Sequence, residues 1–149
     1  MQYILDTNIV SYLLDNKSVF HTRITEKLAK LSSESRIYLS VMTLYEIEYG
    51  IASAKGDTER KKYEIARELL LDFFGVLPAT KKETQIFGVL KSTYQRTTGI
   101  NKKALARHNV DFIIASTAIA NEAILVSNDH IFFDIQKHYT PFKIENWTE

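Results

Sequence analysis

The chain has 149 residues, a length that suits one domain with a buried core. Its apolar content of 45% and charged content of 25% are ordinary for a globular protein, and its formal net charge is +1. The absence of cysteine excludes disulfides, thiolate nucleophiles and cysteine-based zinc sites. Many nucleic-acid-binding proteins are far more basic. Any contact with nucleic acid must therefore depend on local basic clusters, on metals or on a second subunit.

The N-terminus enters a strand pattern directly, without the basic segment and apolar stretch of a signal peptide. No apolar run approaches the roughly 18 residues that a membrane helix needs. We therefore expect a cytoplasmic protein without a membrane anchor. Neither a linker nor an internal repeat is evident, so residues 1–149 are expected to form a single domain.

Short apolar strands alternate with helices along the chain. Strands are predicted at 2–5, 36–39, 75–77, 124–126 and 142–144. Helices are predicted at 9–14, at 20–31, from the N-cap Ser40 to before Gly56, from the N-cap Asp57 to about Phe74, from the capping box at Thr80 to about Thr98, and at 110–121. The polar and basic segment 100–109 is predicted to be a loop. This alternation predicts an α/β fold with a mainly parallel sheet.

Four acidic residues fall where such a fold would bring them to one edge of the sheet. Asp6 and Asp129 directly follow strand patterns. Asp111 lies at or near the first turn of a helix, and Glu46 lies about a turn and a half into another. Early helical turns and the carboxyl ends of parallel strands meet at the same edge. Because like charges there would raise the pKa of one another, we predict a hard divalent metal at this edge, and such metals cleave phosphodiesters.

Each acidic residue also has a simpler structural explanation. Asp6 suits the N-cap of the following helix, and Asp129 suits a turn after a strand. Asp111 suits a helix N-terminus, where the macrodipole stabilises a negative charge, and Glu46 suits a solvated helix surface. The metal site is favoured because all four residues map to one edge.

The segments around these four residues resemble the motifs of PIN-domain nucleases. Residues 3–8 (YILDTN) look like the first motif, and residues 43–50 (TLYEIEYG) look like the second. Residues 111–116 (DFIIAS) resemble the third, and residues 125–129 (LVSND), followed by two phenylalanines, resemble the fourth. The motifs span the whole chain in the order of the family. Within that family the chain looks most like the VapC-type toxins of bacterial toxin–antitoxin pairs.

This resemblance implies a three-layer αβα sandwich and an endoribonuclease that hydrolyses RNA phosphodiesters with Mg²⁺ or Mn²⁺. It assigns metal binding and catalysis to four carboxylates: Asp6, Glu46, Asp111 and Asp129. It gives the orienting of these carboxylates to Asn8 and Ser127, and it lets Asn128 share the work of Asp129. It also implies a homodimer and an antitoxin protein that binds over the active site.

A basic segment precedes the third motif and is longer than is usual in the family. It contains Lys102, Lys103, Arg107 and His108, which are candidates to hold RNA phosphates near the edge of the site. A solvated loop explains the same residues. Among the aromatic residues, Phe73, Phe74, Phe87, Phe112 and Phe132 are predicted to be core, whereas Tyr12, Tyr45 and Tyr49 suit a dimer or partner surface.

Two other classes of function stay open. A non-catalytic PIN-like scaffold would only bind RNA or protein, but the complete acidic set argues against it. A phosphatase-type phosphotransfer enzyme would also place Asp after the first strand. A haloacid-dehalogenase-type phosphatase needs a second Asp where this chain has Asn8, and the paired Asp and Lys of a receiver domain are not found.

Overall fold

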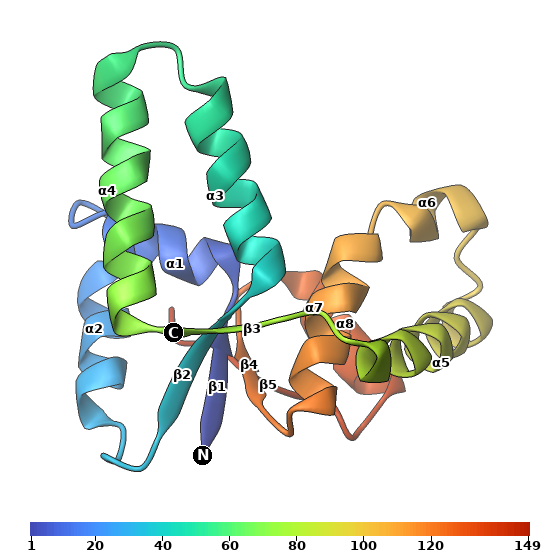
Figure 1. The fold of residues 1–149 in the computed structure, drawn as a ribbon. Helices are drawn as coiled ribbons and strands as arrows, with labels where there is room; N and C mark the ends of the chain where they lie inside the picture. The colour runs from blue at the N-terminus through green and yellow to red at the C-terminus, as the bar shows by residue number, and fades with distance from the viewer.

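The computed structural model describes residues 1–149 as a five-stranded parallel sheet with eight helices around it (Figure 1). The strands are β1 (Gln2–Leu5), β2 (Arg36–Ser40), β3 (Gly75–Leu77), β4 (Ile124–Val126) and β5 (Lys143–Glu145). The helices are α1 (Thr7–Leu14), α2 (His21–Lys30), α3 (Val41–Ser53), α4 (Asp57–Phe73), α5 (Lys81–Thr98), α6 (Lys102–Ala106), α7 (Asn109–Ala120) and α8 (His130–His138). No helix combines the length and the apolar character needed to cross a membrane.

The first strand of the chain lies at the centre of the sheet. The strand order is β3-β2-β1-β4-β5, and all four strand pairs are parallel. Leu5, the last residue of β1, is in register with Leu39 of β2 and with Val126 of β4. The chain therefore adds β2 and β3 on one side of β1 and then β4 and β5 on the other side. Binding sites of parallel α/β proteins form outside the carboxyl ends of the strands, at the place where the strand order reverses in this way.

Two apolar clusters cover the two faces of this sheet. Alternate residues of β1 point to opposite faces, so Ile4 packs in one cluster and Leu5 in the other. The first cluster is built mainly from α5, α7 and α8 and contains the fully buried Phe112 and Phe132. The second is built largely from α1, α2 and the C-terminal Trp147. Helices on both faces of a parallel sheet confirm the predicted three-layer α/β architecture.

Helices project beyond the carboxyl edge of the sheet on two sides (Figure 1). Figure 1 shows α3 and α4 as a hairpin that rises well beyond this edge, while α6 stands on the opposite side, above α5. The hairpin carries exposed apolar side chains, among them Tyr45 and Tyr49 on α3 and Phe73 on α4. Phe73 is 76% exposed, so its predicted place in the core is wrong.

Several helix ends follow the local signals in the sequence. Ser40 accepts a hydrogen bond from the Met42 backbone and begins α3, as predicted. Thr80 and Glu83 form the predicted capping box of α5. Gly99 ends the same helix with φ 71°, a left-handed conformation that glycine adopts without a steric penalty.

Other boundaries differ from the prediction. The segment predicted as a loop contains α6, whose N-cap is Asn101; its side chain accepts from the Ala104 backbone at 2.9 Å. Helix α8 was not predicted; its N-cap, Asp129, was expected to be a metal ligand or a turn residue. Helix α1 begins at Thr7, two residues before its predicted start, and β5 is shifted by one residue toward the C-terminus. Gly56, rather than Asp57, is the N-cap of α4.

Candidate active site

Asp6 is the most buried acidic side chain of the predicted set, with 6% of its surface exposed. It follows β1 directly and is the N-cap of α1. Its Oδ1 accepts from the Thr7 backbone N–H at 2.8 Å, and its Oδ2 accepts from Ser127 Oγ at 2.8 Å. Burial, with smaller contributions from the charges of Asp111 and Glu46, raises the pKa of Asp6 to about 6, although the hydrogen bonds from Ser127 and Thr7 act to lower it. Asp6 is therefore an oriented carboxylate whose charge the fold leaves poorly compensated.

Ser127 connects Asp6 with the segment that carries Asp129. Its side chain is completely buried at the end of β4. The Ser127 hydroxyl donates to Asp6 and accepts from the backbone N–H of Asp129 at 3.0 Å. The Ser127 backbone N–H donates to the Glu145 carbonyl at 3.1 Å. One hydroxyl thus fixes a carboxylate of β1 relative to the start of α8.

Asp111 lies in the first turn of α7, and 27% of its side chain is exposed. Burial raises the pKa of Asp111; the hydrogen bond and charge of His108 oppose this effect, and Asp129 and Glu46 add to it. The partner atoms are His108 Nδ1 and Asp111 Oδ2, 2.9 Å apart. The structure therefore places His108 against a carboxylate and not among the free basic side chains.

Glu46 and Asp129 are the exposed members of the set. Asp129 acts as the N-cap of α8, where its Oδ1 accepts from the Ile131 backbone at 3.2 Å. Glu46 projects from α3. Its charge contributes to the raised pKa of both Asp6 and Asp111, and the charge of Asp129 contributes to that of Asp111. These effects on Asp6 and Asp111 indicate that the four carboxylates, which come from four different elements, lie near one another.

A pair of threonines that the sequence analysis did not single out links α1 with α3. Thr7 Oγ1 donates to Thr43 Oγ1 at 3.4 Å, and Thr43 is completely buried. Thr43 lies one turn before Glu46, so this contact relates the helix that carries Glu46 to the end of β1. The only signal in the sequence is position, because each threonine lies inside a motif that contains an acidic residue.

The remaining predicted residues form no side-chain hydrogen bond or ion pair with the four carboxylates. Asn8 is exposed on α1. The side-chain amide of Asn128 donates to the Tyr12 hydroxyl at 3.5 Å and so is directed toward α1. The three cationic side chains of the basic segment are exposed on α6 and directly after it: Lys102, Lys103 and Arg107.

Comparison with known proteins identifies the family. The model of a family described as PIN domain matches residues 3–138. The chain belongs to the PIN-domain family. The match covers all four carboxylates. Strand β5 lies outside the matched range and completes the sheet next to β4.

Related PIN proteins match along their whole length. The chain is 30% identical to Ribonuclease VapC2 of Rickettsia felis, over 99% of this chain and 98% of that protein. It is 27% identical to Ribonuclease VapC1 of Haemophilus influenzae strain R2866, over the full length of both. The solved VapBC2 of Rickettsia felis, bound to a DNA fragment from its promoter, contains a chain with TM-score 0.73 and 28% identity, each chain being covered to 99%. VapBC-1 from nontypeable Haemophilus influenzae gives TM-score 0.77 and 25% identity with full coverage of both chains.

VapC-type PIN ribonucleases generally require a metal, and the donor set of this chain fits one. All four candidate ligands are carboxylates, the ligand type that hard cations prefer. No group of three or more Asp, Glu or His side chains is arranged to hold an ion by itself. Mg²⁺ commonly uses only one or two carboxylates together with waters and substrate phosphates. Asp6 and Asp111, with their poorly compensated charge, are the candidate ligands that the fold orients best.

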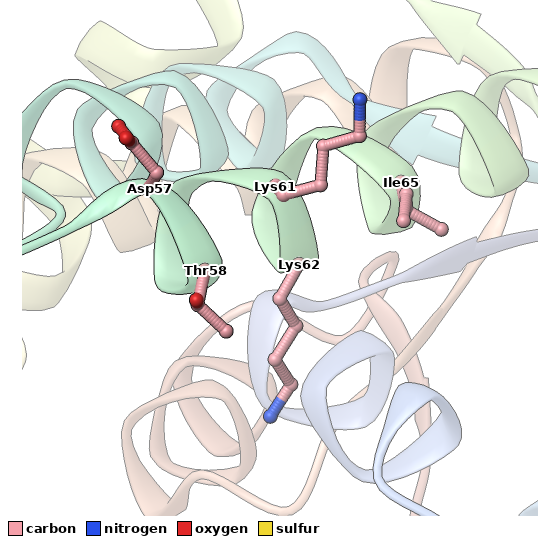
Figure 2. A pocket seen from close by; sticks show the side chains of 5 residues that line it. All are labelled: Asp57, Thr58, Lys61, Lys62 and Ile65. Atoms are coloured by element: carbon pink, nitrogen blue, oxygen red, sulfur yellow. The ribbon is translucent and has the colours of Figure 1, made fainter.

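The surface has several hollows, and only some of them adjoin these carboxylates. One open hollow lies on α4 and is lined by Asp57, Thr58, Lys61, Lys62 and Ile65. Figure 2 shows that Lys61 and Lys62 point in different directions from this helix, so they do not converge on a ligand. Another hollow, of about 400 Å³, includes Asp129 and His108 in its wall and therefore adjoins the PIN carboxylates.

Proposed function

We propose that this chain is an endoribonuclease of the VapC type and the toxin of a toxin–antitoxin pair. The single observation that carries the proposal is the buried, poorly compensated Asp6 beside Asp111 and Glu46 at the carboxyl edge of a parallel sheet. The end-to-end similarity to proteins named Ribonuclease VapC supports RNA as the substrate. A protein of this kind would act in the cytoplasm.

The four carboxylates are proposed to hold Mg²⁺ or Mn²⁺. A divalent ion supplies activation of a water molecule and neutralisation of charge on the phosphate. Asp6 is oriented for this task because both of its oxygens accept hydrogen bonds from fixed donors. Asp111 is held through one oxygen by His108, which leaves its other oxygen for the ion. Glu46 and Asp129 complete the set from the exposed side. No side-chain nucleophile is required.

The exposed cations of α6 are proposed to hold the phosphates of the RNA. Lys102 and Lys103 offer point charges, and Arg107 offers a planar fork of donors. Arg107 directly precedes His108, which contacts Asp111, so an RNA backbone bound here would run toward the carboxylates. With a net charge of only +1, the chain depends on such a local cluster for attraction to RNA.

A homodimer and an antitoxin partner are also part of the proposal. The support is the set of VapBC complexes among the similar structures, together with exposed apolar side chains on the α3–α4 hairpin. Aromatic residues are enriched at protein interfaces, and Tyr45 and Tyr49 are 66% and 75% exposed. Both lie on α3, next to Glu46, so a partner bound there would reach the carboxylates.

The test is cleavage of RNA by the purified chain, with the cut ends mapped by sequencing. Wild-type protein should cut RNA in Mg²⁺ or Mn²⁺ and not in a chelator, and the Asp6→Asn variant should cut it at least about 100-fold more slowly. Thermal unfolding separates catalysis from metal binding, because an ion that binds only the folded state raises its melting temperature. A rise of the melting temperature in Mn²⁺ without any cleavage would favour the non-catalytic scaffold instead.

A further inference from the structure

We propose that a second site, next to the carboxylates, binds one unpaired nucleobase of the RNA. This site is the α8 hollow, defined by His108, Asp129, His130, Phe133, Asp134 and Lys137, with a volume of about 400 Å³. The volume lies within the roughly 300–1,000 Å³ of small-ligand sites. The inference rests on the proposed function, because it concerns how the same substrate is held.

The α8 hollow lies directly beside the carboxylate site. Asp129 lines the hollow and also belongs to the four carboxylates. His108 lines it as well, and its Nδ1 lies 2.9 Å from Asp111 Oδ2. An RNA phosphate held at the carboxylates therefore has the hollow beside it, where the base of a neighbouring nucleotide can turn in.

The charges of the hollow favour a neutral base over a phosphate. The carboxylate of Asp134 accepts from the Tyr94 hydroxyl at 2.7 Å and from Lys137 Nζ at 3.4 Å. The hydrogen bond from Tyr94, with the smaller help of Lys137, lowers the pKa of Asp134 and keeps it ionised. Asp134 thus offsets the charge of Lys137, and Asp129 adds a further negative charge. A phosphate would meet no net positive charge here.

The side chains of the hollow match the two ways in which proteins hold unpaired bases. Phe133 is half-buried and supplies an aromatic surface for stacking. Its neighbour Phe132 and the nearby Ile135 are completely buried, so α8 presents this surface from a rigid support. His130 is exposed and can form hydrogen bonds with a base edge, as can Nε2 of His108, whose Nδ1 is already engaged. A base that enters the hollow must be unstacked, so the bound segment is single-stranded.

The first experiment measures RNA binding by fluorescence anisotropy in Ca²⁺, over a range of salt concentrations. The probes are a labelled random 12-nucleotide single-stranded RNA and a ribose-phosphate chain of equal length without bases. Phe133→Leu should bind the RNA about 5- to 150-fold more weakly, the range that corresponds to loss of one stacked base. Its affinity for the abasic chain and the salt slope should not change. Phe133→Trp should retain wild-type affinity for the RNA.

Two controls separate this effect from damage to the fold. Phe73→Leu removes an equally large aromatic ring from an exposed position on α4 and should bind RNA as the wild type does. The rise of the melting temperature in Mn²⁺ should be the same in Phe133→Leu as in the wild type, because the carboxylates are intact. The exposed His130 provides a variant with little risk to folding: His130→Ala should change the relative affinities for oligo(A), oligo(C), oligo(G) and oligo(U).

The outcomes separate this inference from the proposed function. Equal RNA affinity of wild type and Phe133→Leu overturns the base site and leaves the nuclease intact. A similar loss on the abasic chain, with a reduced salt slope, also overturns it, because the hollow then holds a phosphate. A wild type that neither binds nor cuts RNA overturns the proposed function together with the base site.

Discussion

The buried and the exposed halves of the carboxylate site are built by different means. Asp6 and Ser127 lie inside the protein, joined by a hydrogen bond between β1 and β4. Glu46 and Asp129 lie at the surface, where water can solvate their charges. Both oxygens of the buried Asp6 accept hydrogen bonds from fixed donors, whereas Asp129 is held only through its N-cap bond and Glu46 has no side-chain partner. Placing a negative charge in the buried half destabilises the folded state, since burial is the main cause that raises the pKa of Asp6 to about 6.

The largest expected effect comes from removing the charge of the buried half. Asp6→Asn should lower kcat/KM for RNA by about 10²- to 10⁴-fold, because an ion that has lost its best-oriented ligand contributes several kcal/mol less to the transition state. The measurement is cleavage of a mapped RNA in Mn²⁺. The control, Asp72→Asn, removes an exposed carboxylate on α4 and should cut at the wild-type rate. Equal activity of Asp6→Asn and Asp72→Asn would contradict the assignment of the site.

The same variant should be more stable than the wild type when no metal is present. The pKa of Asp6 is raised from 3.8 to about 6, so between these values the folded state binds more protons than the unfolded state. The free energy of unfolding must therefore fall as pH rises through this window. The loss reaches about 3 kcal/mol at most, since one pKa unit corresponds to 1.36 kcal/mol.

Urea unfolding in a chelator at several pH values measures this loss. Asp6→Asn should exceed the wild type in stability at pH 8, and the difference should shrink below pH 6 and disappear near pH 4. A difference that does not change with pH would mean that the charge of Asp6 is well compensated in the folded state.

Ser127→Ala should show how much the hydrogen bonds of Ser127, which join the two halves, contribute to stability and to metal affinity. The change leaves Asp6 Oδ2 and the Asp129 backbone N–H without their partner, and a buried unsatisfied group costs about 1–3 kcal/mol. Loss of a residue that orients a ligand typically costs 10- to 100-fold in metal affinity. Chemical denaturation and Mn²⁺ titration measure the two effects. Asn8→Ala, an exposed change near the same carboxylate, should stay within about 0.5 kcal/mol.

The smallest expected effect concerns the basic side chains beside the exposed half. Replacing Lys102, Lys103 and Arg107 by Gln should reduce the salt slope of RNA binding by about 2, because each contact with a single-strand phosphate contributes about 0.7. The matched control replaces three cations on α4 by Gln: Arg60, Lys61 and Lys62. An equal change of slope in both triple variants would mean that α6 acts through net charge alone.

Local signals in the sequence predicted much of the fold. The buried apolar runs gave the positions of the strands, and the caps at Ser40 and Thr80 marked helix starts, because a cap acts within a few residues of the chain. Helix α6 was missed because it has only five residues and too little apolar pattern, although its N-cap Asn101 was present. Helix α8 was missed because its N-cap, Asp129, is also a candidate metal ligand, and that role did not point to the start of a helix.

The sequence predicted the edge of the sheet at which the site lies, but not the contacts between its side chains. Placing Asp6 and Asp129 after strands was sufficient to bring them to one end of a parallel sheet. The contact between His108 and Asp111 was not foreseen, because it depends on the turn between α6 and α7. The direction of Asn128 toward Tyr12 depends on how α1 packs near β4, which no local pattern encodes. Side-chain partners follow from packing between distant elements, whereas positions along an element follow from the sequence nearby.

The hydrogen bond between Asp6 and Ser127 joins residues that are 121 positions apart. Loop closure over such a separation must precede this contact, so it forms only after most of the chain has folded. During synthesis on a ribosome, β1 emerges first but has no β4 to pair with until the C-terminal part follows. A nuclease built in this way cannot assemble its carboxylates while it is still being translated. The site is thereby incomplete until synthesis of the chain is almost finished.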